Sequence, residues 1–263
     1  MKLEVLLATM NQEDDQVLET MGIATDVLVC NQNDENSGYR VYEKNGYRVR
    51  WYDFREKGVG LNRNNALFRA TGDICILADD DITYDPGYQE TILRTFRENP
   101  DADMILFNIH SLPGEHRYAA KKKHRVWLHN CGKYGAVRIV FRRMSVIKNA
   151  VCFNQLFGGG AMFTAGEDNM FIRDCIRKGL KVIAVPDYIL KLNDARPSTW
   201  FHGYDRKYFE DMGSSYRYHF RQLAVPCLVL QMLKRRNTLL QEVSFRQAFS
   251  YATAGVKKYK ELR

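Results

Sequence analysis

Short apolar runs alternate with helix-like stretches over the first 110 residues of the chain. The runs are rich in Val, Ile and Leu, which favour strands, and they lie at residues 3–8, 26–30, 47–52, 74–78 and 104–109. Helices are predicted between them, at residues 13–21, 61–70 and 86–99. Strands that alternate with helices are typical of an α/β fold, in which helices flank a mostly parallel central sheet. Ligands bind such sheets beyond the carboxyl ends of the strands, so the loops there are the first place to look for functional residues.

The pattern is less regular after residue 110. Strands are predicted at residues 136–141 and 181–185, the second closed by Pro186, and a helix is predicted at residues 167–178. From residue 207 onward the chain looks helical. We therefore expect an α/β domain over residues 1–200 and a helical C-terminal extension over residues 201–263.

Composition supports a folded, intracellular protein. Hydrophobic residues make up 45% of the chain and aromatic residues 12%, which is enough for a substantial core and excludes a wholly disordered chain. The six cysteines form no C-x-x-C pair and no zinc-like cluster, which indicates reduced thiols. The N-terminal apolar run is too short for an export signal, and the longest apolar stretch, residues 223–233, is about half the length of a membrane span. The expected location is the cytoplasm.

Charge is distributed unevenly along the chain. Residues 1–110 contain 11 Lys and Arg against 20 Asp and Glu, whereas residues 200–263 contain 12 against 5. No zinc finger, helix-turn-helix or RNP-type strand accompanies the basic half, so nucleic acid is not an expected partner. An anionic, phosphate-bearing substrate or an anionic membrane surface fits this distribution.

The C-terminal extension favours a peripheral position at the inner face of the membrane. Lys234, Arg235 and Arg236 follow the apolar run at once, and a second basic stretch with an apolar stripe covers residues 245–260. The alternative is that these apolar residues pack onto the catalytic domain or onto a second subunit in a homodimer, with the cations in solvent.

Three consecutive carboxylates, Asp79, Asp80 and Asp81, end an apolar predicted strand. Like charges this close repel one another unless a cation neutralises them. Mg²⁺ and Mn²⁺ prefer carboxylate oxygens and keep positions open for phosphate oxygens. A metal site at this strand end is therefore favoured over a solvated acidic loop.

A second acidic pair, Glu167 and Asp168, follows a glycine-rich segment and opens a predicted helix. Glycine lets the backbone approach a ligand closely, and carboxylates at a helix start are favoured by the helix dipole. Helix capping alone could therefore explain this pair. Together with the triple Asp, however, it makes two acidic centres, one suited to a metal and phosphate and one to taking up a proton.

In this order the residues resemble family 2 glycosyltransferases of the GT-A fold, over roughly residues 1–200. Asp79 to Asp81 resemble the family's D-x-D motif, Arg63-Asn64 its Ala-Arg-Asn element, and Glu167-Asp168 the pair that supplies the base. The loop after residue 30 and Ser198-Thr199-Trp200-Phe201 are similar to those of bacterial enzymes that build capsular or other surface polysaccharides. In place of the Asp pair with which the family usually reads the donor base, this chain has Asn31-Gln32-Asn33-Asp34.

The resemblance implies a role for each site. Asp79 and Asp81, with a late histidine, His202, would hold Mn²⁺ or Mg²⁺ on the donor diphosphate, and His219 is a second candidate for that histidine. Asp168, supported by Glu167, would be the catalytic base. Donor binding is expected of Thr9, Asn11, Gln32, Arg63, Asp79 and Asp80. Acceptor binding is expected of Gly159, Gly160 and Trp200.

The implied function is inverting transfer of a sugar from a nucleotide-diphosphate donor, expected to be a UDP-sugar, to a glycan or lipid-linked acceptor. Two alternatives stay open. Asp79 and Asp81 also fit D-x-D-x-T, the motif of haloacid-dehalogenase-type phosphatases, although that motif is expected on the first strand of its domain. A non-catalytic binding subunit with a GT-A-like fold is the other.

Overall fold

The computed structural model describes residues 1–35, 37–112, 115, 117–193 and 203–262. The chain divides into two compact units: unit 1 contains Met1–Gln155 and Glu167–Ala195, and unit 2 contains Leu156–Gly166 and Arg196–Arg263. Residues 156–166 thus group with the C-terminal helices, whereas the sequence placed them in a domain over residues 1–200. Gly159 and Gly160 lie in this segment and belong to unit 2.

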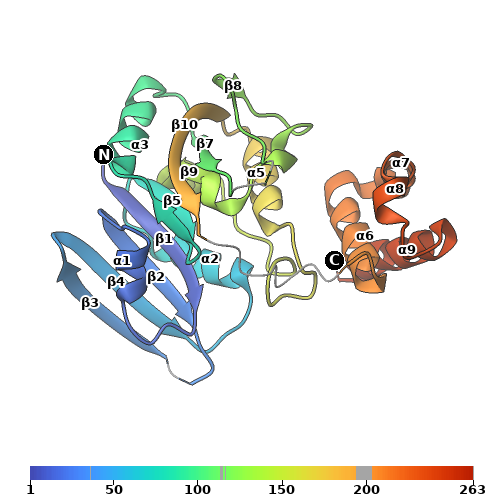
Figure 1. Ribbon diagram of the computed structural model, residues 1–263, viewed down its shortest axis with the longest axis horizontal. Helices are drawn as coiled ribbons and strands as arrows, with labels where there is room; N and C mark the ends of the chain where they lie inside the picture. Colours follow the sequence, from blue (N-terminus) through green and yellow to red (C-terminus); the bar gives the residue numbers. More distant parts are fainter. Residues whose placement is uncertain (36, 113–114, 116, 194–202, 263) are drawn as a thin grey trace. The chain divides into compact units, whose positions relative to one another are not determined.

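Four neighbouring strands of unit 1 are parallel, as predicted. β1 (Leu3–Met10) lies between β2 (Asp26–Gln32) and β5 (Ile74–Asp79), and β4 (Tyr47–Phe54) pairs with the far side of β2. All three pairings are parallel (Figure 1). Ala8 lies beside both Cys30 and Asp79. The carboxyl ends of β1, β2 and β5 therefore lie next to one another.

Antiparallel strands complete the sheet. β9 (Ile139–Arg142) lies between β5 and β7 (Met104–His110), and it is antiparallel to both. β10 (Val182–Leu192) then pairs parallel with β7. The remaining strands, each antiparallel to its neighbour, are β3 (Gly38–Lys44), β6 (Ile82–Tyr84) and β8 (His124–Arg125). The strand order is β3-β4-β2-β1-β5-β9-β7-β10-β6, with β8 paired to β10.

Helices and two cores cover the faces of this sheet. Along β1, Leu3, Val5 and Leu7 belong to one core and Leu6 belongs to the other, because successive side chains in a strand point to opposite faces. The helices of unit 1 are α1 (Gln16–Thr20), α2 (Val59–Arg69), α3 (Tyr88–Glu98), α4 (Arg143–Lys148) and α5 (Glu167–Arg177). Short 3₁₀ turns lie at η1 (Cys131–Lys133) and η2 (Ala136–Arg138).

Several strands differ from the sequence prediction. The short strands β6 and β8 were not predicted, and β9 begins at Ile139 instead of residue 136, because Ala136–Arg138 form the 3₁₀ turn η2. β3 was not predicted, because most of its side chains are exposed and its pattern contains no apolar run. β10 was expected to end before Pro186, but it continues to Leu192. The pairing of β10 with β7 shifts register between Ala184 and Tyr188. Such a shift lets a strand pass a proline, which has no N–H to donate.

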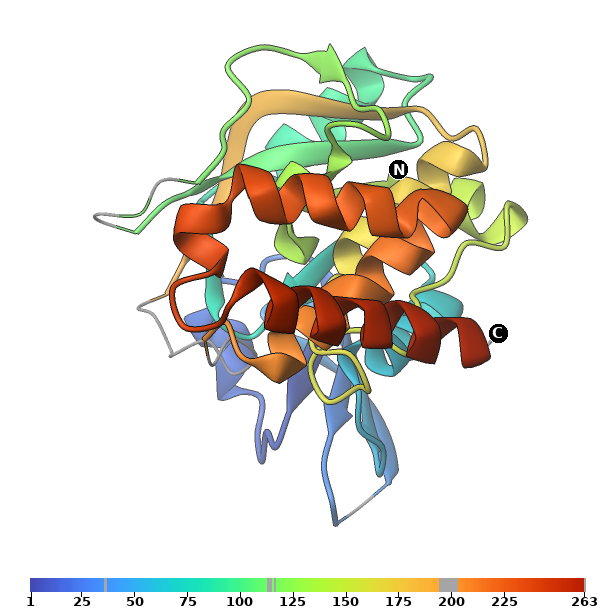
Figure 2. The same cartoon turned by 90° about the vertical axis from the view of Figure 1, so that its right-hand side faces the viewer.

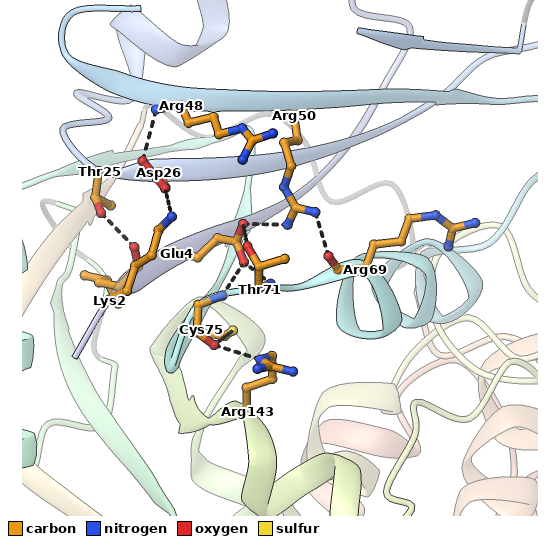
Figure 3. A network of polar contacts seen from close by, with 12 residues as sticks. Lys2, Glu4, Thr25, Asp26, Arg48, Arg50, Arg69, Thr71, Cys75 and Arg143 are labelled. Atoms are coloured by element: carbon orange, nitrogen blue, oxygen red, sulfur yellow. Dashed lines mark hydrogen bonds and ion pairs between the residues drawn. The ribbon is translucent and has the colours of Figure 1, made fainter. Parts of the chain in front are cut away.

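A buried ion pair fixes the amino end of β1. The Glu4 carboxylate lies 2.6 Å from Nη2 of Arg50, and it accepts hydrogen bonds from the backbone N–H groups of Thr71 and Gly72 (Figure 3). Arg50 also donates to the carbonyl oxygen of Arg69, the last residue of α2. A Cβ at Gly72 would lie 2.6 Å from Cβ of Glu4, so only glycine fits there. This contact ties β1 and β4 to the end of α2.

Unit 2 is helical, and its helices are α6 (Arg206–Phe220), α7 (Ala224–Lys234), α8 (Arg236–Leu239) and α9 (Phe245–Glu261), with a 3₁₀ turn, η3 (Arg221–Leu223), before α7 (Figure 2). Two glycines let α6 and α9 pack closely: a Cβ at Gly213 would lie 1.8 Å from the carbonyl oxygen of Ala252, and one at Gly255 would lie 1.9 Å from that of Glu210. In the described part of the chain, no helix combines the length and apolar character needed to cross a membrane.

Candidate active site

Arg63 joins the two acidic centres that the sequence singled out. It lies on α2, which begins after Gly58, a residue whose φ of 117° favours glycine. Its Nη2 is 2.7 Å from Oδ1 of Asp79, at the end of β5, and its Nη1 is 2.6 Å from Oε1 of Glu167, at the start of α5. Asp79 and Glu167 are far apart in sequence, and one guanidinium brings them together.

This guanidinium is almost completely buried. The Arg63 side chain is 5% exposed, whereas that of Asp79 is 35% exposed. Burial disfavours the charged form of Arg63, but the Asp79 and Glu167 carboxylates outweigh it and raise the arginine's pKa above its ordinary value. Arg63 therefore stays charged, and the exposed side of Asp79 can be reached by a ligand.

Asp168 lies in the first turn of α5, next to Glu167. Its Oδ1 accepts hydrogen bonds from the backbone N–H of Asn169 (2.6 Å) and from Nδ2 of the same residue (3.1 Å). Desolvation, helped by the charge of Glu167, raises the pKa of Asp168 to about 7, although Arg63 acts in the opposite direction. A carboxylate with this pKa can take up a proton near neutral pH.

Asp80 is held by one residue at the end of β1 and one in the loop that follows. Oγ1 of Thr9 donates to Oδ2 of Asp80 at 2.7 Å, and Nε2 of Gln12 donates to the same oxygen at 3.1 Å. The backbone N–H of Gln12 also donates to Asn31, at the end of β2. Sequence reasoning missed Gln12. Its place in the loop that follows a predicted strand was the signal that could have found it.

Two polar residues of β2, Asn31 and Gln32, donate hydrogen bonds that connect neighbouring segments of the site. Asn31 is buried, and its Nδ2 donates to Oδ1 of Asp53 (2.7 Å) and to the carbonyl oxygen of Gln12 (2.9 Å). Nε2 of Gln32, a predicted donor-binding residue, donates to the carbonyl oxygen of Gly58 at 3.2 Å. In the structure, Gln32 therefore supports the start of α2, and its role in donor binding stays a prediction.

Two other predicted site residues, Asn11 and Asp81, are exposed. Asn11 is exposed at the end of β1 with φ of 54°, a conformation that Asn adopts more easily than most residues. Asp81 is exposed beside Asp80, and its backbone oxygen accepts from Asn193. Trp200 and His202 lie outside the described residues, and His219 lies on α6 of unit 2.

Among the residues that the structure describes, no three His, Cys, Asp or Glu side chains form a ready-made metal site. Asp79 and Asp81 supply the hard oxygen donors that Mg²⁺ and Mn²⁺ prefer, and both can be reached from solvent. Mg²⁺ is commonly held by one or two carboxylates together with substrate phosphates. The residues therefore fit a metal that arrives with a diphosphate.

The sequence profile of glycosyl transferase family 2 matches residues 25–163, just over half of the chain. This chain belongs to that family. The glycosyltransferase match includes Arg63 and the triple Asp. Membership disfavours the phosphatase alternative, as does the position of the triple Asp, because four strands precede β5 along the chain.

One relative is similar to part of this glycosyltransferase. Glucosyl-dolichyl phosphate glucuronosyltransferase of Haloferax volcanii is 28% identical over 102 residues, which make up 39% of this chain and 26% of that protein. The match thus spans about a quarter of the relative's length.

Solved structures of S. aureus TarS share the fold over nearly the whole chain. The fragment TarS 1-349 has a TM-score of 0.65 at 15% identity, with 99% of this chain and 89% of that fragment covered. Its complex with UDP-GlcNAc has a TM-score of 0.66 at 16% identity, with 99% and 90% covered. The expected GT-A-like α/β fold is confirmed by this likeness.

Proposed function

We propose that the chain transfers a sugar from a UDP-sugar to a hydroxyl group of a glycan or lipid-linked acceptor, with inversion at the anomeric carbon. The observation that carries the proposal is the Arg63 contact, because it joins a strand-end carboxylate suited to a donor diphosphate with the helix start that bears a candidate base. Family membership and the UDP-GlcNAc complex of TarS support the donor class.

Each residue of the site has its own role in this proposal. Thr9 and Gln12 hold Asp80, which is thereby oriented toward the ribose of the donor. Arg63 fixes Asp79 and Glu167, and the exposed side of Asp79 faces the diphosphate with Asp81. Asp168 takes the proton from the acceptor hydroxyl as this oxygen attacks the anomeric carbon from the face opposite the leaving diphosphate.

Asp79 and Asp81 would hold a divalent ion, Mn²⁺ or Mg²⁺, and when bound this ion supplies positive charge that stabilises the leaving nucleotide diphosphate. His202 as a further ligand, and Gly159, Gly160 and Trp200 as acceptor-binding residues, stay predictions. The name of the H. volcanii relative includes a dolichyl phosphate, which supports the lipid-linked class of acceptor. Synthesis of a bacterial surface polysaccharide also stays a prediction.

The first experiment identifies the donor. Nucleotide sugars, beginning with UDP-GlcNAc, are screened by thermal shift with and without Mn²⁺, because a bound donor raises the melting temperature by mass action. Release of the nucleoside diphosphate is then measured with candidate acceptors. Donor binding without any turnover would favour the non-catalytic subunit, and no binding of any nucleotide sugar would contradict the proposal.

A variant pair then tests the metal-binding carboxylates. Asp81→Ala should abolish Mn²⁺-dependent donor binding in calorimetry and leave the fold intact, because it removes a ligand and relieves repulsion among the carboxylates. Asp73→Ala is the matched control: it makes the same charge change just before the amino end of β5, far from the ligand-binding edge of the sheet. Unchanged donor affinity of Asp81→Ala would remove Asp81 from the site.

A further inference from the structure

Helix α7 carries a row of apolar side chains that the other described helices of unit 2 leave uncovered. Leu223, just before the helix, and Leu230 and Leu233 within it are 63%, 66% and 53% exposed, and Pro226 between them is exposed as well. At 3.6 residues per turn these four positions share one side of the helix. We call them the α7 stripe.

The opposite side of α7 is buried within unit 2. Ala224, Leu228 and Met232 are buried, and α7 lies beside α6 and α9 of the same unit (Figure 2). A helix that is apolar on both sides is normally covered on both sides. The α7 stripe therefore needs an explanation of its own.

Charge identifies what would cover the stripe. No Asp or Glu stands between residues 212 and 241, a segment that contains five Lys and Arg residues. Arg221 is exposed at one end of the stripe, and Lys234, Arg235 and Arg236 are exposed at the other. An apolar row with cations at both ends is complementary to a surface that is apolar inside and anionic outside.

We propose that the α7 stripe and these four cations form a docking surface for an anionic lipid bilayer. The three leucines and Pro226 enter the boundary between headgroups and acyl chains, and the cations contact lipid phosphates. Apolar insertion and a basic cluster together give stable yet reversible binding that neither gives alone. The helix lies on the bilayer and does not cross it, in agreement with its length.

Two observations favour a bilayer over a protein partner. The stripe is aliphatic and lacks the aromatic residues that anchor protein interfaces, and its rim contains Lys, which such interfaces tend to exclude. Helix α9, the other basic stretch singled out in the sequence, does not share this role. Its Ala248, Ala252 and Tyr259 are buried, so its apolar stripe belongs to the interior of unit 2.

The test is co-sedimentation of the full chain, without donor or metal, with vesicles of phosphatidylcholine alone or mixed with phosphatidylserine. We expect binding to the mixed vesicles at low salt and its loss at high salt, because salt screens the headgroup attraction. Leu230→Gln/Leu233→Gln should weaken binding by roughly tenfold or more, the scale expected when two leucines no longer leave water. Lys234→Glu/Arg235→Glu/Arg236→Glu should abolish it.

Two matched controls test whether vesicle binding depends on this surface in particular, and not only on net charge or on exposed apolar side chains elsewhere. Lys257→Glu/Lys258→Glu/Lys260→Glu makes the same charge change on exposed positions of α9, and Phe68→Gln removes a side chain of unit 1 that is 60% exposed. Both should bind vesicles nearly as well as the wild type. Near-ultraviolet circular dichroism of each variant checks that it is folded.

Three results would overturn the proposal. Negligible binding to both kinds of vesicle at low salt is the first, and an α9 control as defective as the α7 charge variant is the second. The third is a wild-type dimer in light scattering that Leu230→Gln/Leu233→Gln converts to monomer while vesicle binding is absent, which would assign the stripe to a second copy of the chain. None of these results bears on sugar transfer, which is measured with a water-soluble acceptor.

Discussion

The same sheet carries a buried arginine-carboxylate contact at each of its two ends, and the two contacts differ in how their charges balance. At the amino end of β1, one carboxylate, Glu4, meets one guanidinium, Arg50, and backbone N–H groups fill the rest of its oxygens. At the carboxyl end of β5, one guanidinium, Arg63, is shared by Asp79 and Glu167, with Asp168 close by. At the first contact one negative charge balances one positive charge. At the second contact the carboxylates outnumber the guanidinium, so the net charge is negative.

This difference separates stabilisation from function. A buried ion pair helps a fold only when hydrogen bonds satisfy the remaining polar atoms, as they do for Glu4 (Figure 3). Surplus carboxylates cost free energy in the absence of a ligand, and proteins retain such groups where a cation or a proton is handled. We therefore expect variants at the amino end to change stability and variants at the carboxyl end to change catalysis.

The largest effect is expected for Asp168→Asn. The amide keeps the size and hydrogen bonds of the side chain but cannot accept a proton, so turnover should fall by roughly 10² to 10⁴ while donor affinity is nearly unchanged. Initial rates and calorimetric donor binding measure the two quantities. Asp174→Asn, further along α5, is the control and should retain full turnover. Turnover of Asp168→Asn within threefold of wild type would mean that Asp168 only caps the helix.

Glu4→Gln tests the ion pair between Glu4 and Arg50. It leaves the Arg50 charge buried without its counter-ion, so the free energy of unfolding should fall by about 3–5 kcal/mol. Turnover per folded molecule should not change. Urea denaturation measures the first and initial rates the second, and Glu43→Gln on exposed β3 should alter neither. A loss of less than about 1 kcal/mol, small for a broken buried pair, would show that the Glu4 contact is not structural.

Arg63→Met tests the shared guanidinium and should affect both properties. Turnover should fall, and the free energy of unfolding should fall by about 2–4 kcal/mol at neutral pH, because Asp79 and Glu167 then lie close together without a cation. Urea denaturation and initial rates measure the two quantities. A loss of stability of less than about 1 kcal/mol would contradict this account of the contact.

The smallest effect concerns the pKa of Asp168, raised to about 7 from an ordinary value of 3.8. The base must be ionised, so kcat/KM should rise with pH and level off above about 7. The folded state binds the Asp168 proton more tightly than the unfolded state does. The free energy of unfolding should therefore fall as the pH rises from about 4 to about 7 and this proton is lost. Asp168→Asn should therefore be more stable than wild type at pH 8, by about 1–3 kcal/mol in urea denaturation. A wild-type protein of equal or greater stability there would place the pKa of Asp168 in the ordinary range.

The short central strands were predictable because local patterns determine them. β1, β2, β4 and β5 are apolar runs that end at or within two residues of the predicted ends. β3 has no such run, since it lies at the edge of the sheet and is held by pairing with β4. β10 passes Pro186 because a shift in its pairing with β7 accommodates the missing N–H, which no local pattern reveals.

The sequence by itself determined the types of residue at the site and their places in the chain: carboxylates after one strand and at one helix start, and an arginine in the helix between. Only the tertiary structure decided that Arg63 contacts both carboxylates, that Gln32 supports α2 and that Gln12 holds Asp80. It also separated the two basic stretches of unit 2, since the stripe of α9 is buried and that of α7 is exposed. The physical reason is that residue type and spacing are local properties, whereas the partner of a charge or an apolar face depends on which distant segments the fold brings beside it.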